Sequence, residues 1–313
     1  MSVAGLGVWM PSAEAQILDL FEPYPEKVDL LVVVAHPDDE STFGGLLPHY
    51  AICRGKRVAF VCLTSGEWGN GLPHHTNSEP PDYSYDDRDE PRFEKIDPEA
   101  LYPSFYRESE LSRVLAESGV RFAPVMPRFT DMNGRLTEPW GRPDGCFTLW
   151  GGRDRVVGYL VRQVRRFRPE VVITMAYDGY NGNPQHLAAS HGTIAACEAA
   201  GDPTRYPDGT ARHDAWQVKK LYLAVSEGEE YDLVHRHSWE LPCPRLAART
   251  PPETPRTVAA RANALHQSQL MKNECPASSD FVLRLTTVGP DRTSENDLFE
   301  NVPAGRDRPG DAD

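Results

Sequence analysis

The feature that most constrains this chain is an unbroken apolar run, Asp29–Ala35, which leads directly into a His-Pro-Asp-Asp-Glu sequence. A run of this length without polar alternation predicts a strand buried on both faces, as in a parallel sheet. A helical apolar pattern follows over Ser41–Arg54, ends at Gly55, and gives way to a second apolar strand at Arg57–Leu63. The order strand, helix, strand predicts a βαβ unit with a right-handed crossover.

Similar patterns alternate along the rest of the chain. They predict helices over Tyr106–Ser118, Arg153–Phe167, His186–Ala200 and Pro255–Met271, and strands over Arg121–Arg128, Glu170–Ala176 and Val218–Val225. This alternation is typical of an α/β fold, here a Rossmann-like, mostly parallel, twisted sheet with helices on both faces and a C-terminal extension. We expect one domain over residues 1–313, with a core at about 28–272, a long Pro-rich loop at about 68–103 and a frayed tail at about 290–313.

Charge and cysteine content exclude several classes of function. The chain has 33 basic and 46 acidic residues, a formal net charge of −13. Such a surface repels phosphate backbones and anionic membranes, so we expect neither nucleic acid nor membrane as a partner. The N-terminus lacks the pattern of a secretory signal, and the six cysteines form no C-x-x-C pair. We therefore interpret the chain as a cytoplasmic protein with reduced thiols. Its sparse lysine and its many Ala, Pro and Gly residues suggest a bacterial source, and the sequence leaves a homo-oligomer open.

The most informative segment for function is His36–Glu40, directly after the first strand. A histidine and carboxylates this close together repel one another unless protons or a cation relieve the repulsion. His36 and Asp39 are ordinary zinc ligands, and Asp38 could then accept a proton from water activated by the metal. A purely local role is equally consistent with these residues, with Asp38 or Asp39 capping a helix and Glu40 in its first turn.

A third ligand is expected from another strand end. Ligands of open α/β sheets bind beyond the carboxyl ends of the strands, so the strand ends at His36 and at Tyr177–His186 should converge. The turn before His186 delivers this residue at the start of a helix, which makes it the candidate third ligand. His191 lies about 140° around that helix and is interpreted as a packing residue or a neighbour of the ligands. Two histidines and one carboxylate suit zinc and also iron(II).

Five segments occur in an order that resembles the LmbE/PIG-L family of zinc-dependent N-acetylglucosaminyl deacetylases and related amidases. They are Ala35–Glu40, Thr64–Gly69 (TSGEWG), Arg107–Glu110 (RESE), Asp131–Gly134 (DMNG) and Asn183–His186 (NPQH). The later segment Ala264–Gln269 (ALHQSQ) is similar to the terminal A-x-x-H-x-S-Q helix of the family. The resemblance covers residues 28–272, approximately.

The resemblance implies a set of roles for individual residues. Zinc would bind His36, Asp39 and His186, with Asp38 as the general base. Arg107 would grip sugar hydroxyls, because a guanidinium fork suits a vicinal diol, whereas helix spacing alone favours an ion pair with Glu110. Glu67 would brace the loop after the second strand. Trp68 could stack on a sugar face or simply pack.

One segment departs from the family. Where the family usually has His-Pro-Asp-His, this chain has Asn-Pro-Gln-His at positions 183–186. The first histidine of that motif stabilises the oxyanion and protonates the amine, and the aspartate steadies it. Asn183 could donate to an oxyanion but cannot deliver a proton, and losing a general acid typically costs about 10²–10⁴ in rate. Asp38 once protonated, Tyr180 or His191 could replace it.

The leading hypothesis is a zinc-dependent hydrolase that removes acetyl from an N-acetylglucosamine-type sugar or glycoconjugate. A mycothiol S-conjugate amidase-like C–N hydrolase is the first alternative, because Asp202–Tyr222 and Asn296–Phe299 are similar to that group. The second alternative is a non-catalytic metal- or sugar-binding homologue, which the changes at Asn183 and Gln185 would permit. Retention of Asp38 favours an enzyme, since zinc binding alone does not require it.

Overall fold

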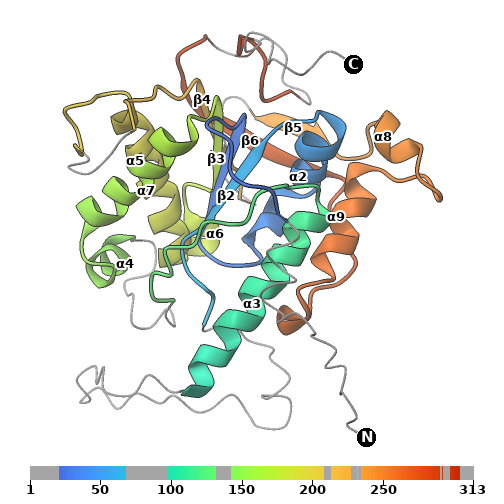
Figure 1. Cartoon of the computed structure of the whole chain (residues 1–313), viewed down its shortest axis with the longest axis horizontal. Coiled ribbons are helices and arrows are strands. Elements are labelled where there is room, and N and C mark those ends of the chain that lie inside the picture. Colours follow the sequence, from blue (N-terminus) through green and yellow to red (C-terminus); the bar gives the residue numbers. More distant parts are fainter. Residues whose placement is uncertain are drawn as a thin grey trace, which may run out of the picture.

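The fold is built on a central sheet, shown in a computed structural model that describes residues 21–67, 98–131, 142–207, 213–226, 231, 234–289, 291 and 297–303 (Figure 1). Within these residues the sheet has six strands in the order β2-β1-β3-β4-β6-β5. They are β1 (Leu30–Val34), β2 (Val58–Cys62), β3 (Val171–Thr174), β4 (Lys220–Ala224), β5 (His235–Ser238) and β6 (Ser278–Thr286). The first four pair in parallel and the last two antiparallel, so the predicted mostly parallel α/β sheet is confirmed.

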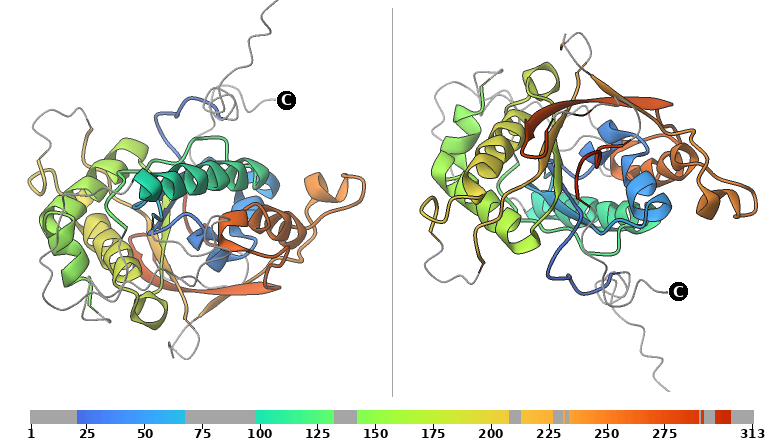
Figure 2. Two further views of the ribbon diagram at one scale, coloured as in Figure 1. Left: turned by 90° about the horizontal axis from the view of Figure 1, so that it is seen from below. Right: turned by 90° about the horizontal axis from the view of Figure 1, so that it is seen from above.

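Helices cover both faces of the sheet (Figure 2). On one face lie α4 (Asp144–Leu149), α5 (Arg153–Phe167) and α7 (Pro184–Ala200), and on the other lie α2 (Leu46–Pro48), α3 (Pro98–Glu117) and α9 (Pro255–Asn263). Shorter elements are the 3₁₀ turns η1 (Asp39–Phe43) and η5 (Gln267–Gln269), the π turn η2 (His49–Cys53), α6 (Gly179–Gly182) and α8 (Pro244–Ala247).

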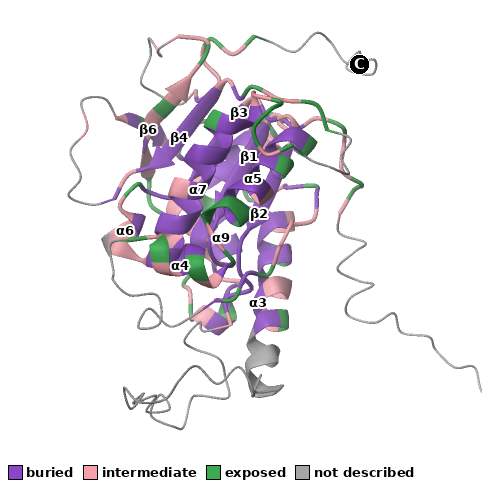
Figure 3. Cartoon of the chain, turned by 90° about the vertical axis from the view of Figure 1, so that its left-hand side faces the viewer, coloured by how far each residue is buried: buried purple, intermediate pink, exposed green. Residues whose placement is uncertain are grey.

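The core follows from the apolar runs. Every residue of β1, β2, β3 and β4 is buried, as expected for strands covered on both faces, and Figure 3 shows the sheet as the buried centre of the molecule. The amphipathic helix α5 buries one apolar stripe against α7. The small residues of α7 allow this close approach, since a Cβ on Gly192 would lie 3.2 Å from Leu160.

The predicted continuous helix over Ser41–Arg54 is wrong, because the structure breaks it into η1, α2 and η2. The interruption lies at Gly44 and Gly45, and Gly44 has a φ of 58°. Both glycines press against the indole of Trp239, so that a Cβ on Gly44 would lie 2.5 Å from its Nε1 atom. The close approach of Trp239, nearly 200 residues later in the chain, therefore ends the regular helix.

Three further predictions need correction. The expected strand at Arg121–Arg128 forms only isolated bridges, such as Val61 with Val125, because Pro124 and Pro127 have no N–H to donate to a ladder. Helix α3 begins at Pro98, within the stretch predicted as loop, and residues 68–97 of that stretch lie outside the described residues. Helix α9 ends at Asn263, eight residues before the predicted boundary.

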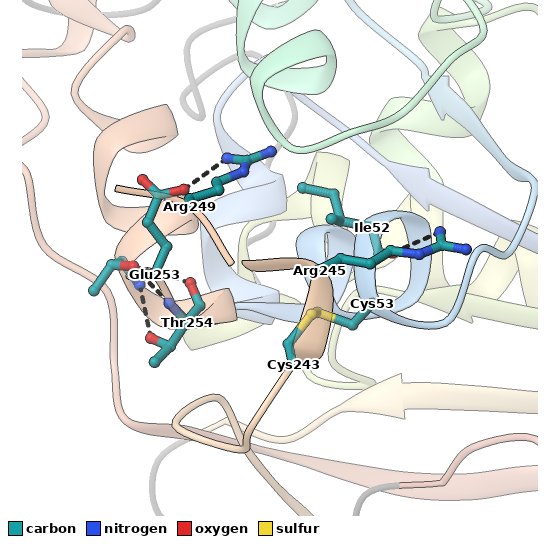
Figure 4. Close-up of a disulfide and its surroundings, with 8 residues drawn as sticks. Ile52, Cys53, Cys243, Arg245, Arg249, Glu253 and Thr254 are labelled. Carbon is teal, nitrogen blue, oxygen red and sulfur yellow. Dashed lines mark hydrogen bonds and ion pairs between the residues drawn. A yellow bond between two sulfur atoms is a disulfide. The ribbon is translucent and has the colours of Figure 1, made fainter. Parts of the chain in front are cut away.

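The interpretation of all six cysteines as reduced thiols is also wrong. Cys53 and Cys243 form a disulfide across a sequence separation of 190 residues (Figure 4). They meet in a small apolar cluster that includes Leu246 and Val258, and the linear spacing of the cysteines gives no sign of this encounter. The other cysteines, Cys62, Cys146, Cys197 and Cys275, are buried free thiols. No helix in the described part of the chain is both long and apolar enough to cross a membrane.

Candidate metal centre

Three side chains from two neighbouring strands meet at one edge of the sheet. His36 and Asp39 follow β1, and His186 lies in the first turn of α7 after β3. Because β1 and β3 pair in parallel, their carboxyl ends lie side by side, and the predicted convergence of the two strand ends is found. The potential ligand atoms of the three residues lie within 4.8 Å of one another. Among the residues that the structure describes, this is the one such group of His, Cys, Asp or Glu.

The spacing of the three donors suits a tetrahedral ion. His36 Nδ1 lies 3.1 Å from His186 Nε2 and 3.5 Å from Asp39 Oδ2, and His186 Nε2 lies 3.2 Å from Asp39 Oδ1. A zinc ion with bonds of about 2.0–2.1 Å holds its ligands about 3.3 Å apart. Two ring nitrogens facing each other at 3.1 Å need a proton or a cation between them. The residues present therefore fit a divalent metal.

The carboxylate of Asp39 is oriented by the backbone. Its Oδ2 atom accepts hydrogen bonds from the N–H groups of Ala35 (3.0 Å) and His36 (2.8 Å), which leaves Oδ1 facing His186. Burial alone would raise the pKa of Asp39, but the two neighbouring imidazoles hold it well below its usual range. Asp39 is thus an ionised carboxylate with one oxygen directed at the candidate metal position.

A hydrogen bond on the nitrogen that faces away from the other donors fixes the ring of His186. Its Nδ1 atom lies 3.1 Å from the carbonyl oxygen of Gly179. A carbonyl can only accept, so Nδ1 carries the hydrogen and the lone pair of Nε2 faces Asp39 and His36. Tyr180 packs edge-on against the same ring, at 6.1 Å between centroids. This arrangement is the usual one for a histidine ligand, whose second nitrogen donates to an acceptor.

The ring of His36 has a side-chain partner instead. Its Nε2 atom lies 3.1 Å from Gln185 Oε1 and 3.5 Å from Asp131 Oδ1, and Gln185 Nε2 lies 2.6 Å from the same oxygen of Asp131. Burial lowers the pKa of His36, but the Asp39 and Asp131 carboxylates together raise it well above its usual value. These contacts of Gln185 and Asp131 with His36 were not predicted from the sequence.

Asp38 lies beside the three donors without joining them. It has a φ of 145°, a strained value for a residue other than glycine, and such strain occurs at functional sites. Its Oδ2 atom lies 3.0 Å from Nη2 of Arg107. Burial raises the pKa of Asp38 to about 6, with the neighbouring Asp39 carboxylate acting in the same direction and Arg107 opposing it.

Arg107 is buried and fully engaged on its outer nitrogens. Nη1 donates to the carbonyl of Gly66 (2.7 Å) and Nη2 to the carbonyl of Pro37 (2.8 Å), in addition to the contact with Asp38. Gly66 has a φ of 68°, and a Cβ there would lie 2.4 Å from Arg107 Nη1, so only glycine allows this approach. The alternative ion pair with Glu110 is wrong, and the assignment of Arg107 to sugar hydroxyls stays a prediction.

Asn183 caps helix α7. Its Oδ1 atom accepts from the backbone N–H groups of Gln185 (2.9 Å) and His186 (3.3 Å). The carbonyl end of the side chain is therefore committed to the helix, and only the amide nitrogen could serve an oxyanion. The cap also fixes the first turn of α7, from which both Gln185 and His186 project.

The remaining candidates lie around this centre or outside the described residues. His191 stacks on Tyr177 at 4.6 Å between ring centroids, and its Nε2 atom bonds to the carbonyl of Tyr177, so it packs near the surface rather than among the donors. Glu67 accepts from the backbone N–H of Asp131 at 3.4 Å, and burial raises its pKa to about 7. Trp68 lies outside the described residues.

Two residues that follow α9 contact buried carboxylates next to the site. We call His266 and Ser268 the C-terminal clasp. His266 Nε2 lies 2.5 Å from Glu40 Oε1, and Ser268 donates to Glu110 from its backbone N–H (2.8 Å) and its hydroxyl (2.5 Å). Glu40 follows the ligand Asp39, and Glu110 lies one turn after Arg107 on α3. The A-x-x-H-x-S-Q pattern marked these residues but did not reveal their partners.

A family profile and several known proteins are similar to this chain, and their descriptions agree with one another. A family profile described as PIG-L, GlcNAc-PI de-N-acetylase, matches residues 31–197. A 1D-myo-inositol 2-acetamido-2-deoxy-α-D-glucopyranoside deacetylase from Streptomyces avermitilis is 34% identical over 198 residues, which are 62% of this chain and 60% of the relative. The match therefore spans less than two thirds of that relative's length.

Two further proteins extend the comparison. A relative from Frankia casuarinae, described as deacetylase 1 for the same compound, is 31% identical over 314 aligned positions that cover 87% of this chain and 94% of the relative. Among solved structures, N,N'-diacetylchitobiose deacetylase from Pyrococcus horikoshii is similar with 16% identity and a TM-score of 0.48, covering 82% of this chain and 76% of that one.

Proposed function

The chain belongs to the PIG-L family, and from this premise we propose that it is a metal-dependent hydrolase that removes the acetyl group from an N-acetylglucosamine-type sugar or glycoconjugate. One observation carries the proposal. Two imidazole nitrogens and one carboxylate oxygen are directed at a common point, and a second carboxylate, Asp38, lies beside them without being a ligand. A site that only bound a metal would not need this additional, strained aspartate.

The metal would be held by His36, Asp39 and His186, and zinc or iron(II) would suit this donor set. When bound, the ion would polarise the acetamide carbonyl and make a water molecule more acidic. The contribution of the protein is to keep three donors in place while leaving room for water and substrate.

Asp38 supplies the proton transfer in this proposal. Its carboxylate accepts the proton of the attacking water, and Arg107 holds the carboxylate in position through the contact at 3.0 Å. Protonated Asp38 then returns the proton to the leaving amine. The amide groups at Asn183 and Gln185 cannot perform this second step, because amides have no proton to release at neutral pH.

Asn183 is proposed to stabilise the oxyanion. Its carbonyl oxygen is engaged in the cap of α7, so its amide nitrogen would donate to the charge that develops on the acetamide oxygen. We also propose Trp68 and Tyr180 as contacts to the sugar. Tyr180 packs against His186, next to the donors, whereas Trp68 belongs to a segment for which no geometry is described.

The proposal extends to the organisation of the protein. We propose that residues 1–313 form one catalytic domain that acts on a small amino-sugar compound. The inositol glycoside of N-acetylglucosamine is the first substrate to test, because it is the compound for which the relatives from Streptomyces and Frankia are named.

Amine release tests the proposal directly. The purified protein, loaded with one equivalent of zinc, is incubated with N-acetylglucosamine, its inositol glycoside, diacetylchitobiose and a thioether-bearing conjugate of an amino sugar, and fluorescamine reports the free amine. We expect release from at least one compound, and none from the Asp38→Asn variant. Release only from a thioether-bearing conjugate of an amino sugar would replace the deacetylase with a conjugate amidase. Binding of a sugar without release from any compound would overturn the enzymatic proposal.

A further inference from the structure

We infer that Gln185 is a positioning residue that sets which nitrogen of His36 faces the metal. The inference rests on the proposed metal centre, and it concerns a residue that contacts neither the metal nor the reacting atoms. Gln185 and Asp131 are both buried, with about 4% of each exposed, and Gln185 lies between Asp131 and His36. Buried polar groups of this kind must satisfy one another, so the direction of each hydrogen bond is constrained.

The direction of the chain of hydrogen bonds follows from Asp131. An ionised carboxylate can only accept, so the group that lies 2.6 Å from Asp131 Oδ1 must be the NH₂ of Gln185. The carbonyl oxygen of the same amide then faces His36 Nε2 at 3.1 Å. Because this oxygen can only accept as well, Nε2 of His36 must carry a hydrogen. The lone pair offered to a metal is consequently that of Nδ1.

The Nδ1 atom is the one that the geometry needs. It lies 3.1 Å from His186 Nε2 and 3.5 Å from Asp39 Oδ2, whereas Nε2 is turned away toward Gln185. The backbone carbonyl of Gly179 accepts a hydrogen bond from Nδ1 of His186, just as the carbonyl oxygen of Gln185 accepts one from Nε2 of His36. Each ring therefore has an acceptor behind it, but only the ring of His36 depends on a side chain for this.

The amide at position 185 suits both of its neighbours in this chain. A carboxylate there could accept from His36, but it would lie against the carboxylate of Asp131 and repel it. An apolar side chain of the same size would satisfy neither neighbour. Glutamine presents a donor to one side and an acceptor to the other, so Gln185 and Asp131 act as a matched pair. Removing the hydrogen-bond partner of a metal ligand typically lowers the metal affinity by about 10–100-fold.

The test compares Gln185→Leu with Gln163→Leu, which alters a second buried glutamine on α5, away from the donors. Zinc affinity is measured by competition with a chromophoric chelator, and the His36 Nε2–H is followed in ¹⁵N-histidine spectra, assigned by its absence in His36→Gln. We expect wild-type protein to protect this hydrogen from exchange and to bind zinc through Nδ1. Gln185→Leu should lose the protection and bind zinc about 10–100-fold more weakly, while Gln163→Leu changes neither.

If Gln185→Leu does not fold, a second variant tests whether Gln185 positions the ring of His36. Asp131→Asn keeps the side-chain volume but replaces a group that can only accept with an amide that can also donate, so the orientation of Gln185 is no longer fixed. We expect a smaller loss of zinc affinity, severalfold, with faster exchange of the His36 Nε2–H. Unchanged affinity and exchange in these variants, or zinc bound through Nε2, would overturn the inference. If wild-type protein binds no zinc, the proposed function fails, whereas the exchange of the His36 hydrogen in metal-free protein still tests Gln185.

Discussion

The carboxylate of Asp38 lies 3.0 Å from the guanidinium of Arg107, and the backbone next to Asp38 in turn binds that guanidinium. Arg107 donates to the carbonyl of Pro37, the residue that precedes Asp38, and to the carbonyl of Gly66 after β2. The guanidinium thus links the loop after β1 to the loop after β2. The proposed base is therefore oriented by an arginine that is itself buried.

Replacing Asp38 with asparagine should separate catalysis from metal binding. Asparagine keeps the shape of the side chain but cannot accept the proton of water, so we expect kcat to fall by about 10²–10⁴. Zinc content, measured by atomic emission, should stay at one equivalent because Asp38 is not among the three donors. Asp214→Asn, on an exposed residue, is the control. A variant that retained more than a tenth of wild-type activity would exclude Asp38 as the base.

Replacing Arg107 with lysine should also lower the rate. Lysine keeps the charge but lacks the fork that reaches Asp38 and two carbonyls together, and a hydrogen bond to a charged group contributes about 1.5–3 kcal/mol. We expect kcat/KM to fall by about tenfold or more with zinc affinity unchanged. Arg113→Lys, at an exposed position of the same helix, should have no effect. Equal activity of the two variants would contradict a role for Arg107 in positioning the base.

The clasp residue Ser268 should contribute to stability. Ser268→Ala removes the hydroxyl that donates to the buried carboxylate of Glu110, and we expect the free energy of unfolding to fall by about 1–3 kcal/mol. Ser190→Ala is the matched control, because the Ser190 hydroxyl is fully buried and makes no hydrogen bond within the described residues. Urea denaturation measures both. Similar midpoints for the two variants would show that the contact with Glu110 is not stabilising.

Acid should destabilise the protein through buried histidines near β5. Burial lowers the pKa of His237 to about 3 and that of His49 to about 4. The neighbouring imidazole of His49 acts in the same direction on His237, and the guanidinium of Arg54 does so on His49. Unfolded histidine binds a proton near pH 6.5, so the unfolded state holds more protons between pH 6.5 and 4. The stability that these rings contribute is thus present above pH 6.5 and is lost as the pH falls.

The size of this effect can be measured. Each such histidine costs up to about 1.4 kcal/mol per pH unit below 6.5. Urea midpoints at pH 7.5, 5.5 and 4.5 should therefore fall steeply for wild type and less steeply for His237→Phe. His213→Gln, which alters an exposed histidine, should retain the wild-type slope. Parallel slopes for wild type and His237→Phe would show that His237 is not the titrating group.

The disulfide should stabilise the protein as well. Cys53 and Cys243 close a loop of 190 residues, and native disulfides typically contribute about 2–4 kcal/mol. We expect reductant to lower the urea midpoint of wild type but not that of the Cys53→Ser, Cys243→Ser double variant. Thiol titration of denatured, unreduced protein should find the four free cysteines. Six titrating thiols in freshly purified protein would show that the pair is not formed.

The central fold could be predicted because its strands are unbroken apolar runs. The runs at β1, β2 and β3 have no other stable environment than a sheet covered on both faces, and α5 shows a clear apolar stripe. The antiparallel strand β5 could not be recognised, because its sequence His-Arg-His-Ser is polar. Its burial depends on tertiary contacts, because the ring of His237 packs on Trp239 and Phe281 and that of His235 packs on Tyr222.

The candidate site was predictable to the extent that parallel topology determines it. Strand ends that carry His36 and His186 must meet when β1 and β3 are neighbours. The orientation of the Gln185 amide could not be predicted, because it is set by Asp131, which arrives from a different segment of the chain. The contacts of the C-terminal clasp could not be predicted either, because His266 and Glu40 are 226 residues apart and no local pattern connects them.

The clasp has a consequence for the order in which the protein is made. Synthesis proceeds from the N-terminus, so Glu40 and Glu110 leave the ribosome well before residues 266 and 268, which lie 226 and 158 positions further on. Until then the two carboxylates have no partner from the clasp and must stay hydrated. A ribosome-bound chain that already contains all three metal donors therefore still lacks these contacts to Glu40 and Glu110, which form only after residues 266 and 268 have been synthesised.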